Sequence, residues 1–179
     1  MARLDPIPVE KLTPEQQKVH AVLAGTRKRV TGPFAIWLRL PNVAYTANEF
    51  THALREEGLL EKRQFELLVM IVTRHWSAQY AWAQHEPLAL AAGLTSEVIE
   101  DIREKRKPVF SKSDEQLLYD MATELLTTME LSTATYNRMI KHFGIERTVE
   151  AISVTGFYGM VSTVLKGFDV PTPNGERPF

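Results

Sequence analysis

The chain has no cysteine among its 179 residues. A disulfide framework and a thiolate metal site are therefore excluded. A reaction whose nucleophile is a thiolate is excluded as well, because no other side chain supplies one. The absence of cysteine leaves the cellular compartment open.

The sequence also lacks a long apolar run and a large net charge. The first eight residues do not form the apolar stretch of a secretory signal. The most apolar segment late in the chain, 149–165, carries several polar side chains and is short for a membrane span, which needs about 20 residues. The formal net charge is −1, so neither nucleic acid nor a membrane is expected as a partner. We expect a cytoplasmic protein.

Motifs for bound groups are equally scarce. No glycine-rich loop indicates phosphate or dinucleotide binding. Glu86 stands next to His85, but two ligands without a supporting carboxylate or histidine at helical spacing make a poor metal site. We therefore expect no metal and no cofactor.

What the sequence does contain is helical periodicity. Hydrophobic residues make up 44% of the chain and charged residues 24%, as in an ordinary globular protein, and no segment shows convincing two-residue alternation. These features predict an all-α fold, a single domain over 1–179 built as a bundle of seven or eight helices. The predicted helices are 14–25, 41–57, 61–74, 78–92, 95–107, 113–130, 132–142 and 146–166, with a short apolar segment at 34–40 and an irregular tail at 171–175.

Polar residues mark several of the predicted helix starts. A capping box is expected at 113–116, and single N-caps are expected at Thr13, Ser77, Thr95 and Ser132. Helix 61–74 is apolar almost all round, which predicts burial. In helix 41–57, the apolar residues Val43, Ala47, Phe50 and Leu54 lie three to four apart and predict one inward-facing stripe. The basic runs 27–29 and 103–107 are interpreted as solvated faces.

Glu66 and His85 are the residues whose spacing suggests chemistry. In one straight helix, nineteen residues would separate them by about 28 Å at 1.5 Å per residue. The segment 74–77 is instead a predicted break between two helices, and it lies midway between the two residues. Residues equally far from the turn of an antiparallel helix pair lie side by side, so the spacing predicts contact across a helical hairpin. The plainer alternative is that Glu66 satisfies a backbone group or Arg74.

The stretch 77–87, Ser-Ala-Gln-Tyr-Ala-Trp-Ala-Gln-His-Glu-Pro, together with Glu66 resembles the core motif of the carboxymuconolactone decarboxylase and alkylhydroperoxidase-D-like superfamily. In the peroxidase branch this motif reads Glu, eleven residues, Cys, two residues, Cys, three residues, His. Glu66 and His85 hold the outer positions, while Ala78 and Ala81 stand where the two cysteines would be. A thiol peroxidase is therefore excluded, and the resemblance is to the cysteine-less branch.

The resemblance covers about 32–173, from Gly-Pro-Phe at 32–34 to Phe-Asp-Val-Pro at 168–171. It implies a helical bundle of the alkylhydroperoxidase-D-like type with an N-terminal helical extension and a short C-terminal tail. It also implies assembly as a homotrimer or homohexamer. Two positions depart from the family pattern, Ala81 where relatives often have Glu, and Lys166 where Asn is expected, so the family's substrate need not transfer.

The family positions indicate three catalytic residues. His85 is the expected proton donor, because the pKa of histidine ordinarily lies near working pH. Glu66 is expected to orient and charge His85, since a carboxylate in the apolar run 65–72 would be costly to bury without a partner. Tyr80 is expected to donate a hydrogen bond to an enolate oxygen, with an interior role beside an unrelated partner as the alternative.

Four further residues are expected to bind the substrate. Arg74 and His75 lie at the helix break, where their side chains can reach a pocket, and Arg74 can hold a carboxylate through two hydrogen bonds. The alternative for Arg74 is a surface ion pair. Trp76 and Trp82 are expected in the core or the pocket wall.

Two functions follow. The first is a cofactor-free decarboxylase that acts on a small carboxylated lactone or a related acid of aromatic-compound catabolism. The second is a non-decarboxylating member, either an isomerase or ring-opening enzyme that uses the same pair, or a binding scaffold that kept only the helices. A scaffold should have Glu66 and His85 in structural hydrogen bonds with no cavity beside them, whereas an enzyme needs that cavity.

Overall fold

The computed structural model describes residues 2–27 and 29–179. Lys28, in the basic run 27–29, lies outside the described residues. The described residues form eight α-helices, one 3₁₀ helix and no strand, so the predicted all-α fold is confirmed. The elements are η1 (Val9–Lys11), α1 (Pro14–Thr26), α2 (Pro33–Trp37), α3 (Pro41–Glu56), α4 (Lys62–His75), α5 (Gln79–Ala91), α6 (Ser96–Arg103), α7 (Ser113–Thr128) and α8 (Thr133–Gly167).

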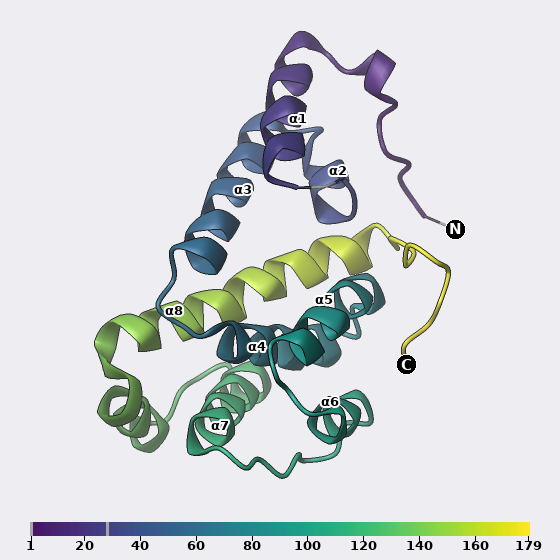
Figure 1. Ribbon diagram of the computed structural model, residues 1–179. Coiled ribbons are helices and arrows are strands. Elements are labelled where there is room, and N and C mark those ends of the chain that lie inside the picture. Colours follow the sequence, from purple (N-terminus) through teal and green to yellow (C-terminus); the bar gives the residue numbers. More distant parts are fainter. Residues whose placement is uncertain (1, 28) are drawn as a thin grey trace.

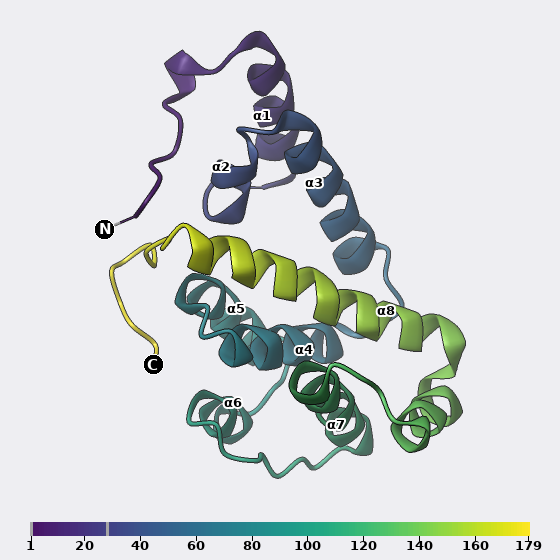
Figure 2. The ribbon, with the colours of Figure 1, turned by 180° about the vertical axis from the view of Figure 1, so that it is seen from behind.

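Helix α8 runs across the middle of the molecule between two groups of helices (Figures 1 and 2). On one side lie α1, α2 and α3. On the other side α4 and α5 form a helical hairpin, with α6 and α7 beyond it. Helix α4 is buried continuously from Arg63 to Thr73, as its nearly all-apolar sequence predicts, because such a helix is stable only when neighbours cover every side.

Most helix starts agree with the capping prediction, and two differ. Thr13 forms a capping box with Gln16, and the hydroxyls of Thr95 and Ser132 cap α6 and α8. Ser77 is not an N-cap, because it lies in the α4–α5 turn at φ 51°. The predicted capping box at 113–116 is also wrong, since helix α7 begins after Lys112 without a side-chain cap and its first acidic residues bind Arg63 instead.

The predicted inward stripe of α3 is only partly buried. Val43 is 42% exposed and Phe50 is 44% exposed. The buried positions of α3 are the small or polar residues Ala44, Ala47, Asn48 and Thr51, so Ala47 is the one member of the predicted stripe that is fully buried. Helix α3 packs against α1, and small side chains allow that close approach, so its larger apolar residues line an open groove with Met160 of α8.

Helix α8 changes direction at Gly144, where φ is 76°, a backbone conformation that favours glycine. The sequence predicts a boundary between two helices at this point. By length and composition alone, α8 could cross a membrane. Core helices of soluble proteins pass the same test, and more than half of the apolar window is buried within this fold, so the feature is weak evidence for a span.

A buried carboxylate holds the joint between α3 and α4. Glu150 of α8 accepts hydrogen bonds from the backbone N–H groups of Leu59, at 2.7 Å, and Leu60, at 3.1 Å. A side chain at Gly58 would overlap this carboxylate, since a Cβ atom there would lie 2.1 Å from Glu150 Oε1. The joint therefore sets how the end of α3, which carries Arg55, meets α4, which carries Glu66.

Candidate active site

Glu66 and His85 meet across the α4–α5 hairpin. The chain turns at Trp76 and Ser77, and α5 then returns along α4. Glu66 Oε2 lies 2.7 Å from His85 Nδ1. The predicted contact is confirmed, because the two residues lie at similar distances from the turn.

This contact determines how His85 is presented. An ionised carboxylate can only accept hydrogen bonds, so His85 Nδ1 carries a proton and donates it to Glu66, and Nε2 is left for a ligand. Glu66 Oε1 lies 3.7 Å from Arg55 Nη2. Only 4% of Glu66 and 8% of His85 are exposed, and a buried charge requires partners of this kind.

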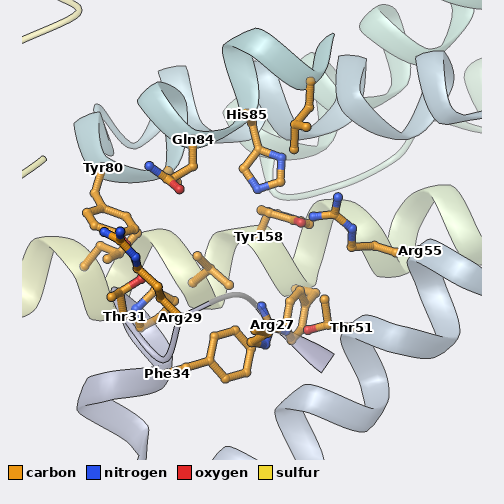
Figure 3. Close-up of a pocket in the computed structure, with 16 residues that line it drawn as sticks. Arg27, Arg29, Thr31, Phe34, Thr51, Arg55, Tyr80, Gln84, His85 and Tyr158 are labelled. Atoms are coloured by element: carbon orange, nitrogen blue, oxygen red, sulfur yellow. The ribbon is translucent and has the colours of Figure 1, made fainter. Parts of the chain in front are cut away.

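His85 lines a cavity of about 200 Å³ between the two groups of helices (Figure 3). Tyr80, Gln84 and His85 reach it from α5, while Arg27 and Arg29 reach it from the segment between α1 and α2. Glu66 lies behind His85 and is not part of the wall. The other lining residues are Thr31, Pro33, Phe34, Thr51, Arg55, Ala81, Leu88, Phe157, Tyr158, Val161 and Leu165.

Tyr158 of α8 closes the cavity beside His85. The two rings pack edge to face, with their centres 5.1 Å apart, and Tyr158 also packs edge to face on Phe65. Burial raises the pKa of Tyr158 well above its ordinary value, and the Glu66 charge adds to this, although the Arg55 charge opposes it. Tyr158 is therefore a neutral hydroxyl that can donate a hydrogen bond in the cavity at physiological pH.

Tyr80 is fixed against the segment that precedes α2. Its hydroxyl donates to Thr31 Oγ1 at 2.9 Å. Gly32 adopts φ 58°, and a Cβ atom there would lie 2.4 Å from Tyr80 Cε1. Glycine at this position therefore allows the segment to approach the Tyr80 ring.

The four residues predicted to bind substrate lie elsewhere. Arg74 Nε donates to the Arg103 carbonyl at 2.5 Å, and its guanidinium lies over the Phe179 ring. His75 lies beside it in a separate cleft, where burial and the Lys105 charge lower the pKa of His75. Trp76 is 41% exposed. Trp82 is wholly buried, as the core alternative predicted, and donates to Glu86 Oε2 at 2.8 Å.

These positions follow from the geometry of the turn. Arg74 and His75 end α4 on the side of the hairpin that faces α6, and Trp76, the next residue, lies beside Gly159 of α8. His85 lies two turns into α5 on the side that faces α8. The helix break therefore brings Glu66 and His85 together, but the residues of the break itself, 74–77, do not line the cavity beside His85.

Sequence reasoning missed the arginines of the cavity and Tyr158. The basic run 27–29 was interpreted as solvated, but Arg27 is half-buried and lines the cavity with Arg29. A signal for Tyr158 was present, since it carries a polar hydroxyl within the apolar segment 149–165. Nothing in the spacing of Arg55 distinguishes it from a surface arginine. Among the described residues, no three histidines or carboxylates gather in a way that could hold a metal ion.

Two solved structures share this arrangement of helices. One is the crystal structure of an uncharacterized peroxidase-related protein from Silicibacter sp. TM1040, with a TM-score of 0.78 and 16% sequence identity over 99% of this chain and 96% of that one. The fold is that of the AhpD-like proteins. The second, a protein of unknown function from Agrobacterium tumefaciens described as a candidate antioxidant defence protein AhpD, has a TM-score of 0.66 and 16% identity over 74% of this chain and 92% of that one.

At this identity the likeness establishes the AhpD-like fold and leaves the activity to the site itself. The sequence matches no protein-family model and no curated protein sequence. Of the two motif positions that hold cysteine in the peroxidase branch, Ala81 lines the cavity and Ala78 is buried at the start of α5. At both positions a methyl group therefore replaces the sulfur atom that a thiol peroxidase requires.

Proposed function

We propose that this AhpD-like protein is a cofactor-free acid–base enzyme, a decarboxylase of small carboxylated lactones or related acids of aromatic-compound catabolism. The observation that supports it is the cavity beside the Glu66–His85 pair. His85 presents Nε2 toward this space, and Glu66 is buried behind the ring with both oxygens close to partners. A scaffold that used the pair only for packing would not need a ligand-sized space at this point.

The proposed reaction needs one proton and one placed hydrogen-bond donor. The bond between the ring carbon and the departing carboxylate breaks, carbon dioxide leaves, and the electron pair delocalises into the lactone carbonyl as an extended enolate. Protonated His85 then donates its Nε2 proton to carbon and recovers a proton from solvent. The Glu66 carboxylate, 2.7 Å from Nδ1, stabilises the positive charge of His85 before this transfer.

We propose that two tyrosines stabilise the enolate oxygen. Tyr80, the predicted donor, lines the cavity but donates to Thr31 here, so its hydroxyl must rotate toward the substrate. Tyr158 lies against the His85 ring and stays protonated. A neutral donor in a site that excludes water stabilises a developing negative charge more strongly than water does.

Thiol peroxidase activity is not proposed. The peroxidase-related description belongs to the Silicibacter protein, and the present chain has no cysteine to act as nucleophile or resolving thiol.

The test is mass spectrometry of the protein incubated with a panel of carboxylated lactones and ring-cleavage acids. We expect one substrate to lose the mass of carbon dioxide. The variant His85→Ala should lower this rate by about 10²–10⁴-fold, the usual contribution of a positioned acid or base, with unchanged circular dichroism. The variant His142→Ala, which removes an exposed histidine of α8, is the matched control and should retain the rate.

Three outcomes would contradict the proposal in different ways. Full turnover by folded His85→Ala would remove His85 from the mechanism. A product of unchanged mass that depends on His85 would replace decarboxylation by isomerisation. No turnover across the panel would reject this substrate class and favour a non-catalytic role.

A further inference from the structure

A second cleft, of about 290 Å³, lies between the end of α4, the segment after α6 and helix α7 (Figure 1). It shares no lining residue with the cavity beside His85. Arg74 and His75 reach it from α4, and Lys105 and Arg106 reach it from the segment after α6. The cleft therefore gathers four basic side chains that the proposed reaction does not use.

The buried part of the cleft is apolar, whereas its exposed part is basic. Ile71 and Ile102 line it and are only 6% and 4% exposed, and Leu126 and the Tyr119 ring are half-buried beside them. Lys105 and the other two side chains at the surface are basic. A ligand that covers both parts needs an apolar body and a negative charge.

The positive charge of the cleft lacks compensation. Its lining residues, all within the described chain, include no Asp or Glu. Arg106 pairs with Asp101 at 2.9 Å, but among the described residues neither Arg74 nor Lys105 forms an ion pair with a carboxylate. Burial lowers the pKa of Arg74, although the Glu104 charge opposes this. A partly buried cation of this kind is stabilised by a bound anion.

Arg74 is held in a defined orientation. Its Nε donates to the Arg103 carbonyl at 2.5 Å, and its Nη1 donates to Ser77 Oγ at 3.3 Å. The guanidinium carbon lies 4.2 Å from the centre of the Phe179 ring. Nη2 makes no hydrogen bond to a described residue, so its N–H groups are available to an anion.

Lys105 occupies a backbone position that usually belongs to glycine. Its φ is 56°, and the Arg106 N–H donates to the Asp101 carbonyl at 2.8 Å, as in the helix-ending motif whose left-handed residue is commonly glycine. A side chain with a Cβ atom is strained in this conformation. The Lys105 charge also contributes to lowering the pKa of His75, so its ammonium lies near the cleft. Strain at a residue that lines a cleft indicates a use for its side chain.

We propose that this cleft is a binding site for an aromatic monocarboxylate, with the ring against Ile71 and Ile102 and the carboxylate between Arg74 and Lys105. Inorganic phosphate would leave the apolar lining uncovered, and a neutral hydrocarbon would leave the two cations uncompensated. The volume of about 290 Å³ lies at the lower end of the roughly 300–1,000 Å³ of sites for drug-sized ligands, which suits one ring. The site is separate from the proposed reaction and is tested by binding alone.

The experiment is an NMR titration of the protein at low salt with benzoate, the neutral benzamide and acetate. The ring signals of His75 and the methyl signals of Thr123 and Leu126, which line the cleft, report binding there. We expect benzoate to bind about tenfold more tightly than benzamide, because it forms charge-assisted hydrogen bonds. It should also bind about tenfold more tightly than acetate, which has no ring to cover the apolar lining.

Variants of the two cations test the assignment. Arg74→Gln and Lys105→Gln should each lower the preference for benzoate over benzamide about threefold, and Lys105→Arg should keep it, because it restores the cation. Lys105→Gly should lose as much as Lys105→Gln without lowering the urea midpoint, because glycine relieves the backbone strain. The Lys105 variants therefore keep the test open if Arg74→Gln does not fold. The control Lys141→Gln removes an exposed lysine of α8 and should keep the preference.

Three outcomes would overturn the site. These are equal binding of benzoate and benzamide by wild type, a preference that survives both Arg74→Gln and Lys105→Gln, and benzoate shifts confined to the His85 ring, which would place the ligand in the other cavity. Equal binding of benzoate and acetate would remove the apolar half of the assignment. His85→Ala should keep the preference, so a protein that binds benzoate here without decarboxylase activity would reject the reaction and leave this site standing.

Discussion

Replacing Arg63 by methionine tests the network that anchors helix α4, which carries Glu66. Arg63 lies one turn before Glu66 on α4. Its Nη1 lies 2.5 Å from Glu115 Oε1 and its Nη2 lies 2.7 Å from Asp114 Oδ2, both on α7. Gln64 Nε2 also donates to Asp114 at 2.7 Å. Methionine keeps much of the length of arginine but leaves the two carboxylates without their cation.

The expected loss of unfolding free energy is about 3 kcal/mol at pH 7. Removing one partner of a buried ion pair costs about 3–5 kcal/mol, because the remaining charge stays buried without compensation. The Arg63 and Glu115 side chains are only 8% and 6% exposed, whereas Asp114 is 15% exposed and keeps Gln64, which favours the lower end of that range. The matched control is Arg138→Met, whose pair with Asp120 is largely exposed and should contribute about 0–1 kcal/mol.

The loss should depend on pH in a defined direction. Burial raises the pKa of Asp114, but hydrogen bonds from Gln64 and Arg63 and the Arg63 charge outweigh it, so the pKa is lower in the folded protein. A lowered carboxyl pKa contributes stability that is present above the unfolded pKa, about 3.9, and is lost as pH falls through the folded pKa. The difference between wild type and Arg63→Met should therefore shrink below about pH 4.

The assay is urea unfolding followed by circular dichroism at several pH values, with the slope of the transition compared between proteins. Adding Glu115→Gln to Arg63→Met should recover part of the loss, because a buried amide costs less than a buried carboxylate. A loss below 1 kcal/mol at pH 7, or one that does not change between pH 7 and pH 3, would refute the assignment of this energy to buried charge.

Two further predictions concern the cavity segment and assembly. Gly32→Ala should lower the free energy of unfolding by about 1–3 kcal/mol, because Gly32 lies at positive φ and an added Cβ atom would overlap the Tyr80 ring. Gly175→Ala, also at positive φ but in open space, isolates the backbone strain in the same urea assay, and equal losses in the two variants would exclude the overlap. The family resemblance implies a homotrimer or homohexamer, and we propose that the exposed apolar residues Val43 and Phe50 lie in its subunit interface. Sedimentation equilibrium should give three or six chain masses for wild type and fewer for Phe50→Asp, and a monomeric mass for wild type would contradict the proposal.

Helix positions were predictable because local rules decide them. Thr13, Thr95 and Ser132 cap helices in the structure as their neighbours predict. The failures occur where a distant partner competes with a local rule. Ser113 and Gln116 were expected to form a capping box, but helix α7 begins after Lys112. The two acidic residues between them bind Arg63 of another helix, and a buried ion pair of this kind exceeds the value of a cap.

The sequence by itself determined the helical class and the Glu66–His85 contact, because both depend on period and on distance from a single turn. It also excluded thiol chemistry, because composition alone decides that. Only the tertiary structure decided which other side chains share the cavity. Arg27, Arg55 and Tyr158 come from three segments far apart in the chain, and no sequence spacing records that α8 and the α1–α2 segment close over α5. Arg74 shows the converse, since its place at the break of the α4–α5 hairpin does not bring its side chain to the cavity beside His85.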